Sequence, residues 1–265
     1  MHAFQYHRPA SLKDALALGS QKDEGRYLAG GQSLVQAMKL RLSSPTDLID
    51  LNSLSDLKAL KVEGRTVTVG AMVRHAEVAA SSAVQRAIPA LAALAAMIGD
   101  RQVRHMGTIG GSLANNDPAA DYPAAVLGLG ATIATSKRKI EADKFFRGLY
   151  ETALEPGELL TSVSFPAPKR AAYTKFKNPA SRFAIVGVFV AQFDNGVRVA
   201  VTGAGPGVFR HAEMEKALSA RFTADAVASI KVSAEGLNSD LHATPEYRAH
   251  LVTVMARRAV EAALG

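Results

Sequence analysis

The chain has 265 residues, of which 48% are apolar and 21% are charged, and its formal net charge is +7. A chain of this length can form one large or two ordinary domains with a well-buried core. It has no cysteine, so it holds no disulfide, no thiolate nucleophile and no zinc or iron–sulfur cluster ligated by cysteine. Any electron carrier that it uses must therefore be organic or belong to another chain.

The first part of the chain predicts a small parallel sheet. Ser11 is expected to cap a helix that follows Pro9. The elements expected next are a strand ending over 26–28, a glycine loop over 29–33, a helix over 34–40 and a buried strand over 47–51. This β–loop–α–β order favours a parallel strand pair with a right-handed crossover. A hairpin with strands over 59–62 and 66–69 follows.

The middle of the chain predicts alanine-rich helices over 75–81 and 90–98, followed by a loop over 99–106. The basic run Lys137-Arg138-Lys139 lies between two β-like runs, so we interpret it as a solvated hairpin tip. No aromatic residues are interleaved with it, which argues against nucleic-acid binding. A strand over 159–165 ends in the Pro- and Lys/Arg-rich stretch 166–170, which we take as the domain boundary.

The last part of the chain predicts a second α+β unit. Residues 183–193 and 197–202 are β-rich, and Asn195-Gly196 between them favours a tight hairpin turn. Helices are expected over 211–218, 224–230 and 245–264. The loop 201–207 is similar to a dinucleotide fingerprint but fails its G-x-G-x-x-G spacing, so we interpret it as structural.

Two glycine pairs, Gly30-Gly31 and Gly110-Gly111, have nearly the same local sequence. In each, Gly-Gly is followed by one or two polar residues and then by Leu. Consecutive backbone N–H groups in such turns form an anion-binding nest, and a following helix N-terminus adds positive potential. Ser33, Thr108 and Ser112 add hydroxyl groups. Two nests suit a diphosphate, whereas the alternative is a pair of structural turns, and the local chemistry alone leaves both open.

Four charged residues could add to such a site. Asp117 and Asp121 could accept hydrogen bonds from a ribose or an adenine amine, although each could also cap a helix. Lys175 and Lys177 alternate along a strand, and a lysine near a flavin pyrimidine edge would stabilise negative charge on the ring. The alternative is a solvated strand face, which we expect for Lys175 rather than for Lys177.

No segment has the pattern of a signal peptide or a membrane span. The N-terminus lacks an apolar core segment, and the most apolar stretch, 87–98, is short and interrupted by Pro89. We therefore expect a cytoplasmic protein without a transmembrane segment.

The two glycine segments, together with Asp117-Pro118-Ala119-Ala120-Asp121, resemble the FAD-binding medium subunit of molybdenum hydroxylases. This is the family of aerobic carbon monoxide dehydrogenase and xanthine dehydrogenase, and the likeness covers essentially the whole chain. The resemblance implies an α+β fold with a two-part FAD-binding domain of the vanillyl-alcohol-oxidase (PCMH) type over 1–168. Its subdomains would span about 1–57 and 58–168, and a smaller α+β domain would follow over 171–265.

The resemblance also implies the site. The two glycine segments would wrap the FAD diphosphate, Asp121 would hold the adenosine part, Leu160 would lie near the flavin and Lys177 would approach its pyrimidine end. The FAD-binding residues implied in this way are Leu28, Ala29, Gly30, Gly31, Gln32, Ser33, Leu34, Thr108, Ile109, Gly110, Gly111, Ser112, Asp121, Leu160 and Lys177. The chain departs from the family pattern at Gln32, at Ser112 and at Arg182-Phe183.

The implied function is electron transfer. In this family a molybdenum-binding large subunit oxidises the substrate, and an iron–sulfur small subunit with [2Fe-2S] clusters relays electrons to the FAD. The flavin then reduces NAD, a quinone or oxygen, and a heterohexamer is expected. The alternatives are a free-standing FAD-dependent oxidoreductase of the same fold, acting on its own substrate, and a basic interaction protein without a flavin.

Overall fold

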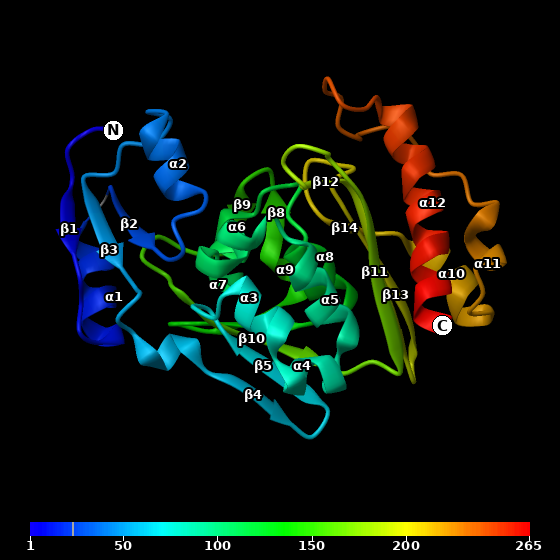
Figure 1. Ribbon diagram of the computed structural model, residues 1–265, viewed down its shortest axis with the longest axis horizontal. Coiled ribbons are helices and arrows are strands. Elements are labelled where there is room, and N and C mark those ends of the chain that lie inside the picture. The colour runs from blue at the N-terminus through cyan, green and yellow to red at the C-terminus, as the bar shows by residue number, and fades with distance from the viewer. Residues whose placement is uncertain (23) are drawn as a thin grey trace.

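The computed structural model describes residues 1–22 and 24–265. Three sheet-centred regions follow one another along the long axis of the molecule, with the N- and C-termini in the two outer regions (Figure 1). The first region holds a small three-stranded sheet, the second a five-stranded sheet with helices, and the third a four-stranded sheet with the C-terminal helix.

The first region is the predicted parallel unit. Its strands are β1 (Gln5–His7), β2 (Gly25–Leu28) and β3 (Asp47–Asp50), and its helices are α1 (Leu12–Gln21) and α2 (Leu34–Lys39). β1 and β2 each pair in parallel with the central β3, so the predicted parallel pair is confirmed. Ser11 caps α1 as expected, because its side chain accepts a hydrogen bond from the N–H of Asp14.

The second region is built on an antiparallel sheet in the order β4-β5-β10-β6-β7. Its strands are β4 (Leu60–Glu63), β5 (Thr66–Gly70), β6 (Thr132–Thr135), β7 (Lys139–Glu141) and β10 (Leu160–Pro166). The short elements at its margins are the 3-10 turn η1 (Ser55–Lys58), α9 (Ala142–Phe145), β8 (Phe146–Gly148) and β9 (Glu151–Thr152). Both hairpins expected from the sequence, β4-β5 and β6-β7, are present.

The basic hairpin tip of this sheet is exposed at all three basic residues, as expected, and two of them also form ion pairs. Arg138 donates from Nε and Nη2 to the carboxylate of Glu158, and Lys137 pairs with Glu155. The Glu158 side chain is fully buried. An acidic partner twenty residues away along the chain, which local sequence does not reveal, therefore holds this tip.

Six helices between β5 and β6 gather over this sheet (Figure 1). They are α3 (His75–Ala80), α4 (Ser82–Ala87), α5 (Pro89–Met97), α6 (Arg101–Met106), α7 (Ile109–Asn115) and α8 (Tyr122–Gly128). The expected loop over 99–106 is wrong, because Asp100 caps α6 by accepting from the N–H of Val103. None of the α6 residues is buried, so this helix has no apolar periodicity by which the sequence could reveal it.

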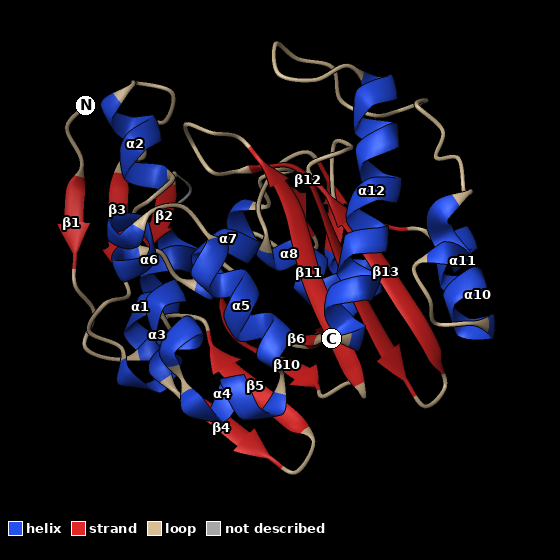
Figure 2. Cartoon of the chain, turned by 45° about the vertical axis from the view of Figure 1, so that its right-hand side comes forward, coloured by secondary structure: helices blue, strands red, loops and turns tan. Residues whose placement is uncertain are grey.

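The third region is a four-stranded antiparallel sheet in the order β11-β12-β13-β14. Its elements are β11 (Arg170–Lys177), β12 (Ala184–Phe193), β13 (Gly196–Thr202), β14 (Phe209–Arg210), α10 (Ala212–Ala220), α11 (Asp225–Ala228) and α12 (Pro245–Leu264). Figure 2 shows α12 lying across this sheet. The first eight residues of β12 are all buried, because α12 covers one face of the sheet and α5 and α8 of the second region cover the other.

The second and third regions share a core. Tyr173 and Phe189 of the four-stranded sheet belong to the same apolar cluster as Val163 and Phe165 of β10. A second cluster lies between β12, β13 and α12, and a third lies under the parallel sheet. Within residues 1–22 and 24–265, no helix combines the length and the hydropathy needed to cross a membrane.

Candidate FAD-binding site

The two predicted glycine loops lie side by side. A Cβ built on Gly30 would stand 2.2 Å from the carbonyl oxygen of Met106 and 2.7 Å from Cα of Gly107. A Cβ on Gly111 would stand 3.4 Å from Cβ of Ala29. Backbone therefore meets backbone at this junction, and only glycine at position 30 permits so close an approach.

The first loop leaves its N–H groups open. Gly31 takes the left-handed conformation, with φ of +69°, and Ser33 precedes α2 without a side-chain capping bond. In the part of the chain that the structure describes, the N–H groups from Gly30 to Leu34 donate no hydrogen bond. Consecutive free N–H groups at a helix start are the arrangement that binds a phosphate.

Two polar residues at the end of β3, Asp50 and Asn52, hold this loop, and the sequence analysis missed them. Asn52 donates from Nδ2 to the carbonyl oxygen of Ala29 at 3.1 Å and to Oδ1 of Asp50 at 2.7 Å. The Tyr6 hydroxyl in turn donates to Oδ2 of Asp50. The acidic residues inside the buried DLIDL segment were the available signal, since an acidic side chain in a buried strand needs a partner.

The second loop differs from the expected nest. The N–H of Ile109 donates to the carbonyl of Val73, the N–H of Gly110 donates to that of Ala71, and the N–H of Gly111 donates to Oγ1 of Thr108. These donors are therefore already used, and Gly110 is needed for packing, because a Cβ there would stand 2.6 Å from Cβ of Ala71. The loop instead offers the hydroxyl groups of Thr108 and Ser112.

A buried pair of rings supports the second loop. His75 donates from its backbone N–H to the carbonyl of Gly107, and its ring packs 5.3 Å from the ring of Tyr122. A Cβ on Gly107 would stand 2.5 Å from Nε2 of His75. Burial, with a contribution from Arg104, lowers the pKa of His75 to about 4, so the ring is neutral near pH 7.

Asp121 and Lys175 lie elsewhere than the sequence analysis expected. Asp121 is only 4% exposed, and its carboxylate accepts hydrogen bonds from the Tyr173 hydroxyl and from Nζ of Lys175. Lys175 was expected on a solvated face, but its side chain is 2% exposed, so that expectation is wrong. Burial raises the pKa of Asp121, while Lys175 and Tyr173 oppose the increase.

The remaining candidate residues divide by exposure. Lys177, at the end of β11, is exposed, and Leu160 is buried in the core at the start of β10. Asp117 neither caps a helix nor lies free, because it accepts from the N–H of Ala119 and from the Tyr150 hydroxyl. Leu28, Gln32 and Leu34 flank the first loop and are partly exposed.

The residues present fit the FAD diphosphate. The open N–H groups from Gly30 to Leu34 belong to a loop that lies beside a second loop carrying two hydroxyl groups, so the donors come from two different elements. Backbone N–H and hydroxyl donors do not titrate near neutral pH, so the cradle keeps its donors whatever the pH. These features define a nucleotide-binding α+β protein.

The chain matches two known families over nearly its whole length. Residues 2–168 match the FAD binding domain in molybdopterin dehydrogenase, and residues 171–263 match the CO dehydrogenase flavoprotein C-terminal domain. The chain therefore belongs to the family of molybdopterin-dehydrogenase flavoproteins. This bears out the resemblance that the paired glycine segments carried, and the fold class with it.

Individual relatives are similar along their full length. The carbon monoxide dehydrogenase medium chain of Afipia carboxidovorans is 36% identical over 278 residues, covering 98% of this chain and 96% of the relative. The glyceraldehyde dehydrogenase medium chain of Sulfolobus acidocaldarius is 35% identical over 272 residues, with coverages of 97% and 96%. The structure of carbon monoxide dehydrogenase from Hydrogenophaga pseudoflava superposes with a TM-score of 0.91 at 35% identity, over 99% of this chain and 98% of that one.

Proposed function

We propose that this chain is the FAD-binding electron-transfer subunit of a molybdenum hydroxylase complex. The observation that carries the proposal is the run of open N–H groups from Gly30 to Leu34 beside a second glycine loop, in a chain that has no cysteine. The open N–H groups suit an anionic diphosphate. The absence of cysteine means that any cysteine-ligated iron–sulfur cluster must belong to another chain.

The proposed residue roles follow from position. Gly30 to Leu34, with the hydroxyls of Thr108 and Ser112, would hold the diphosphate. Leu160 would supply an apolar wall near the flavin, and the exposed Lys177 would place its ammonium near the pyrimidine end. FAD, when bound, would accept electrons one at a time and pass on a hydride or single electrons. The chain itself would bind and orient the cofactor, with no catalytic side chain of its own.

The proposed partners are an iron–sulfur small subunit carrying [2Fe-2S] clusters and a molybdenum-binding large subunit, assembled as a heterohexamer. The electron acceptor would be NAD, a quinone or oxygen, and the complex would be cytoplasmic. Relatives named for carbon monoxide and for glyceraldehyde are almost equally identical to this chain, so the choice of substrate is best assigned to the partner chain.

We further propose that the chain divides into an FAD-binding domain over 1–168, with subdomains of about 1–57 and 58–168, and a C-terminal domain over 171–265.

The experiment is purification of the full chain from its native cells, with and without its partners, followed by FAD, iron and molybdenum analysis. We expect one FAD per chain, with iron and molybdenum only when partners are present. Rapid mixing of the complex with its donor should reduce the FAD after the clusters. A preparation without FAD contradicts the proposal, and turnover of an organic donor by the isolated chain favours the free-standing oxidoreductase instead.

A further inference from the structure

A buried ion pair joins the second and third regions. Nζ of Lys175 lies 2.9 Å from Oδ2 of Asp121, and the two side chains are 2% and 4% exposed. Asp121 directly precedes α8, whereas Lys175 is in β11, fifty-four residues further along the chain. A pair so deeply buried is held in one geometry, because either charge left alone would be strongly destabilised.

Lys175 uses all of its donors. Besides Asp121, Nζ donates to the carbonyl oxygen of Met97 at 3.0 Å and to that of Arg182 at 2.8 Å. An ammonium group has three donors, so each one is engaged. One side chain thus ties together the end of α5, the start of α8 and the loop that joins β11 to β12.

That loop, residues 178–183, is closed on itself. The N–H of Asn178 donates to the carbonyl of Phe183, and the N–H of Arg182 donates to the carbonyl of Asn178. Asn178 Oδ1 also accepts from the N–H groups of Ala180 and Ser181. A loop this tightly bonded moves as a unit, so the contact from Lys175 to Arg182 sets its position.

We infer that Asp121 and Lys175 act together to position Lys177 and the 178–183 loop against the flavin end of the site, and that neither side chain contacts the adenosine. The inference rests on the proposed function. Lys177 lies two residues beyond Lys175 in the same strand and directly before the loop, so the anchored lysine fixes where the exposed one stands. Asp121 is a positioning residue, because it is only 4% exposed and both of its carboxylate oxygens are held by donors within the chain.

The test uses the full chain, with FAD and ADP as probes. The main variant is Asp121→Asn combined with Lys175→Met, which removes both charges together. The measurements are the midpoint potential of the bound flavin and the affinity of the apoprotein for FAD and for ADP. Lys177→Met is measured alone and combined with the double variant. We expect both the double variant and Lys177→Met to lower the midpoint potential of the flavin. When the double variant is combined with Lys177→Met, the potential should fall little further. The affinity for ADP should be unchanged.

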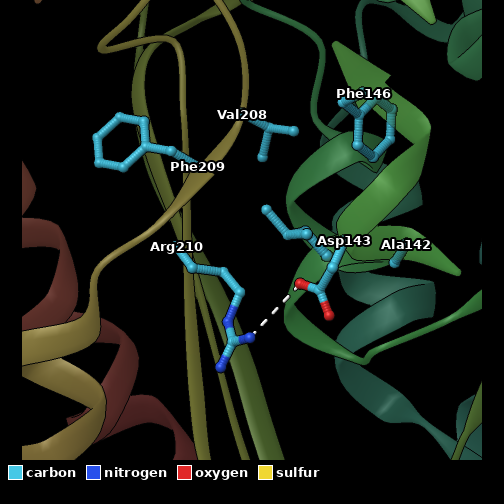
Figure 3. A pocket seen from close by; sticks show the side chains of 7 residues that line it. Ala142, Asp143, Phe146, Val208, Phe209 and Arg210 are labelled. Carbon is cyan, nitrogen blue, oxygen red and sulfur yellow. Dashed lines mark hydrogen bonds and ion pairs between the residues drawn. The ribbon is translucent and has the colours of Figure 1, made fainter. Parts of the chain in front are cut away.

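A matched control is Asp143→Asn, which breaks another ion pair between the second and third regions. Asp143 Oδ1 lies 2.7 Å from Nη2 of Arg198 and 3.4 Å from Nη1 of Arg210. It lines a cavity of about 210 Å³ that includes none of the proposed FAD residues (Figure 3). The control should leave the flavin potential unchanged, so that a shift in the main variant reports position and not a general loosening between the regions.

Three outcomes overturn the inference. If the double variant weakens ADP binding and Lys177→Met does not, Asp121 or Lys175 contacts the adenosine directly. If Lys177→Met shifts the potential and the double variant does not, the ion pair does not position Lys177. If Lys177→Met leaves the potential unchanged while FAD still binds, the Lys177 role falls together with the inference, but the diphosphate site stands. Should the double variant fail to fold, Tyr173→Phe removes one hydrogen bond to Asp121 and must give a smaller shift in the same direction.

Discussion

Gly30 rests directly on the carbonyl group of Met106: a Cβ at residue 30 would stand 2.2 Å from that oxygen. No real Cβ tolerates that distance to backbone, so a side chain here must push the two loops of the proposed site apart. The spacing of these loops is therefore set by the missing side chain at residue 30, and one added methyl group would change it.

Gly30→Ala is accordingly expected to weaken FAD binding by at least about tenfold and to destabilise the chain by about 1–3 kcal/mol, as overpacking does. The control is Gly207→Ala, because a Cβ there meets nothing within 4 Å. FAD content after purification and fluorescence titration of the apoprotein give the binding. A Gly30→Ala protein that retains full FAD affinity would show that the junction is not part of the site.

Thr108→Val separates a capping role from a binding role. Thr108 Oγ1 accepts from the N–H of Gly111 at the start of α7, and losing such a cap costs about 1 kcal/mol. Ser11→Ala removes an equivalent cap from α1, which lies outside the site. We expect similar losses of stability in urea unfolding but weaker FAD binding in Thr108→Val alone. Equal FAD affinities would mean that Thr108 only caps the helix.

His75 predicts a stability that falls in mild acid. Burial lowers its pKa from 6.5 to about 4. Between these two pH values His75 is therefore protonated in the unfolded chain but stays neutral in the folded chain. The contribution of neutral His75 to the free energy of unfolding is fully present above pH 6.5. It is lost as the pH falls toward 4, by about 3 kcal/mol over the whole interval. Urea unfolding of wild type and His75→Phe at several pH values measures the effect. The two proteins should diverge steadily across this interval, and parallel curves would exclude a neutral buried His75.

Arg138→Met and Lys137→Met compare the stability contributed by two neighbouring cations, one paired with a buried carboxylate and one with an exposed carboxylate. Burial opposes ionisation of Glu158, but hydrogen bonds from Arg138 and Thr135 lower its pKa to about 2. Arg138 is 42% exposed but its partner Glu158 is buried, so breaking this pair should cost more than breaking an ion pair between two exposed side chains. Lys137 pairs with the exposed Glu155, and its loss should cost under about 1 kcal/mol.

Thermal unfolding near pH 7 ranks these two variants. Glu158 is ionised in the folded chain down to about pH 2, so its contribution is present above pH 4.5 and fades as the pH falls. The gap between Arg138→Met and wild type should therefore narrow in acid. A larger loss for Lys137→Met than for Arg138→Met would contradict the assignment.

Local sequence determined most of the elements. The cap at Ser11, the turn at Asn195-Gly196 and the β4-β5 hairpin depend on a few neighbouring residues, so the sequence predicts them without knowledge of the fold. The α6 helix was missed because none of its residues is buried, and such a helix leaves no apolar pattern in the sequence.

The arrangement of the site could be predicted only in part, for a related reason. The two glycine segments lie together, whereas their binding of one anion stays a prediction. The local sequence did not reveal that carbonyl groups in residues 71–73 already accept hydrogen bonds from the N–H groups of Ile109 and Gly110, because those acceptors come from a different segment of the chain. It likewise placed Lys175 in solvent, since its partner lies fifty-four residues away.

The sequence by itself thus determined which segments turn, which begin helices, and that no cysteine-ligated cluster belongs to this chain, because these depend on neighbouring residues and on composition. Only the tertiary structure decided which backbone donors stay open, which charges are buried and which lysine remains exposed. Burial and hydrogen-bond saturation are set by contacts between residues distant in the chain, and those contacts exist only once the three sheets have packed.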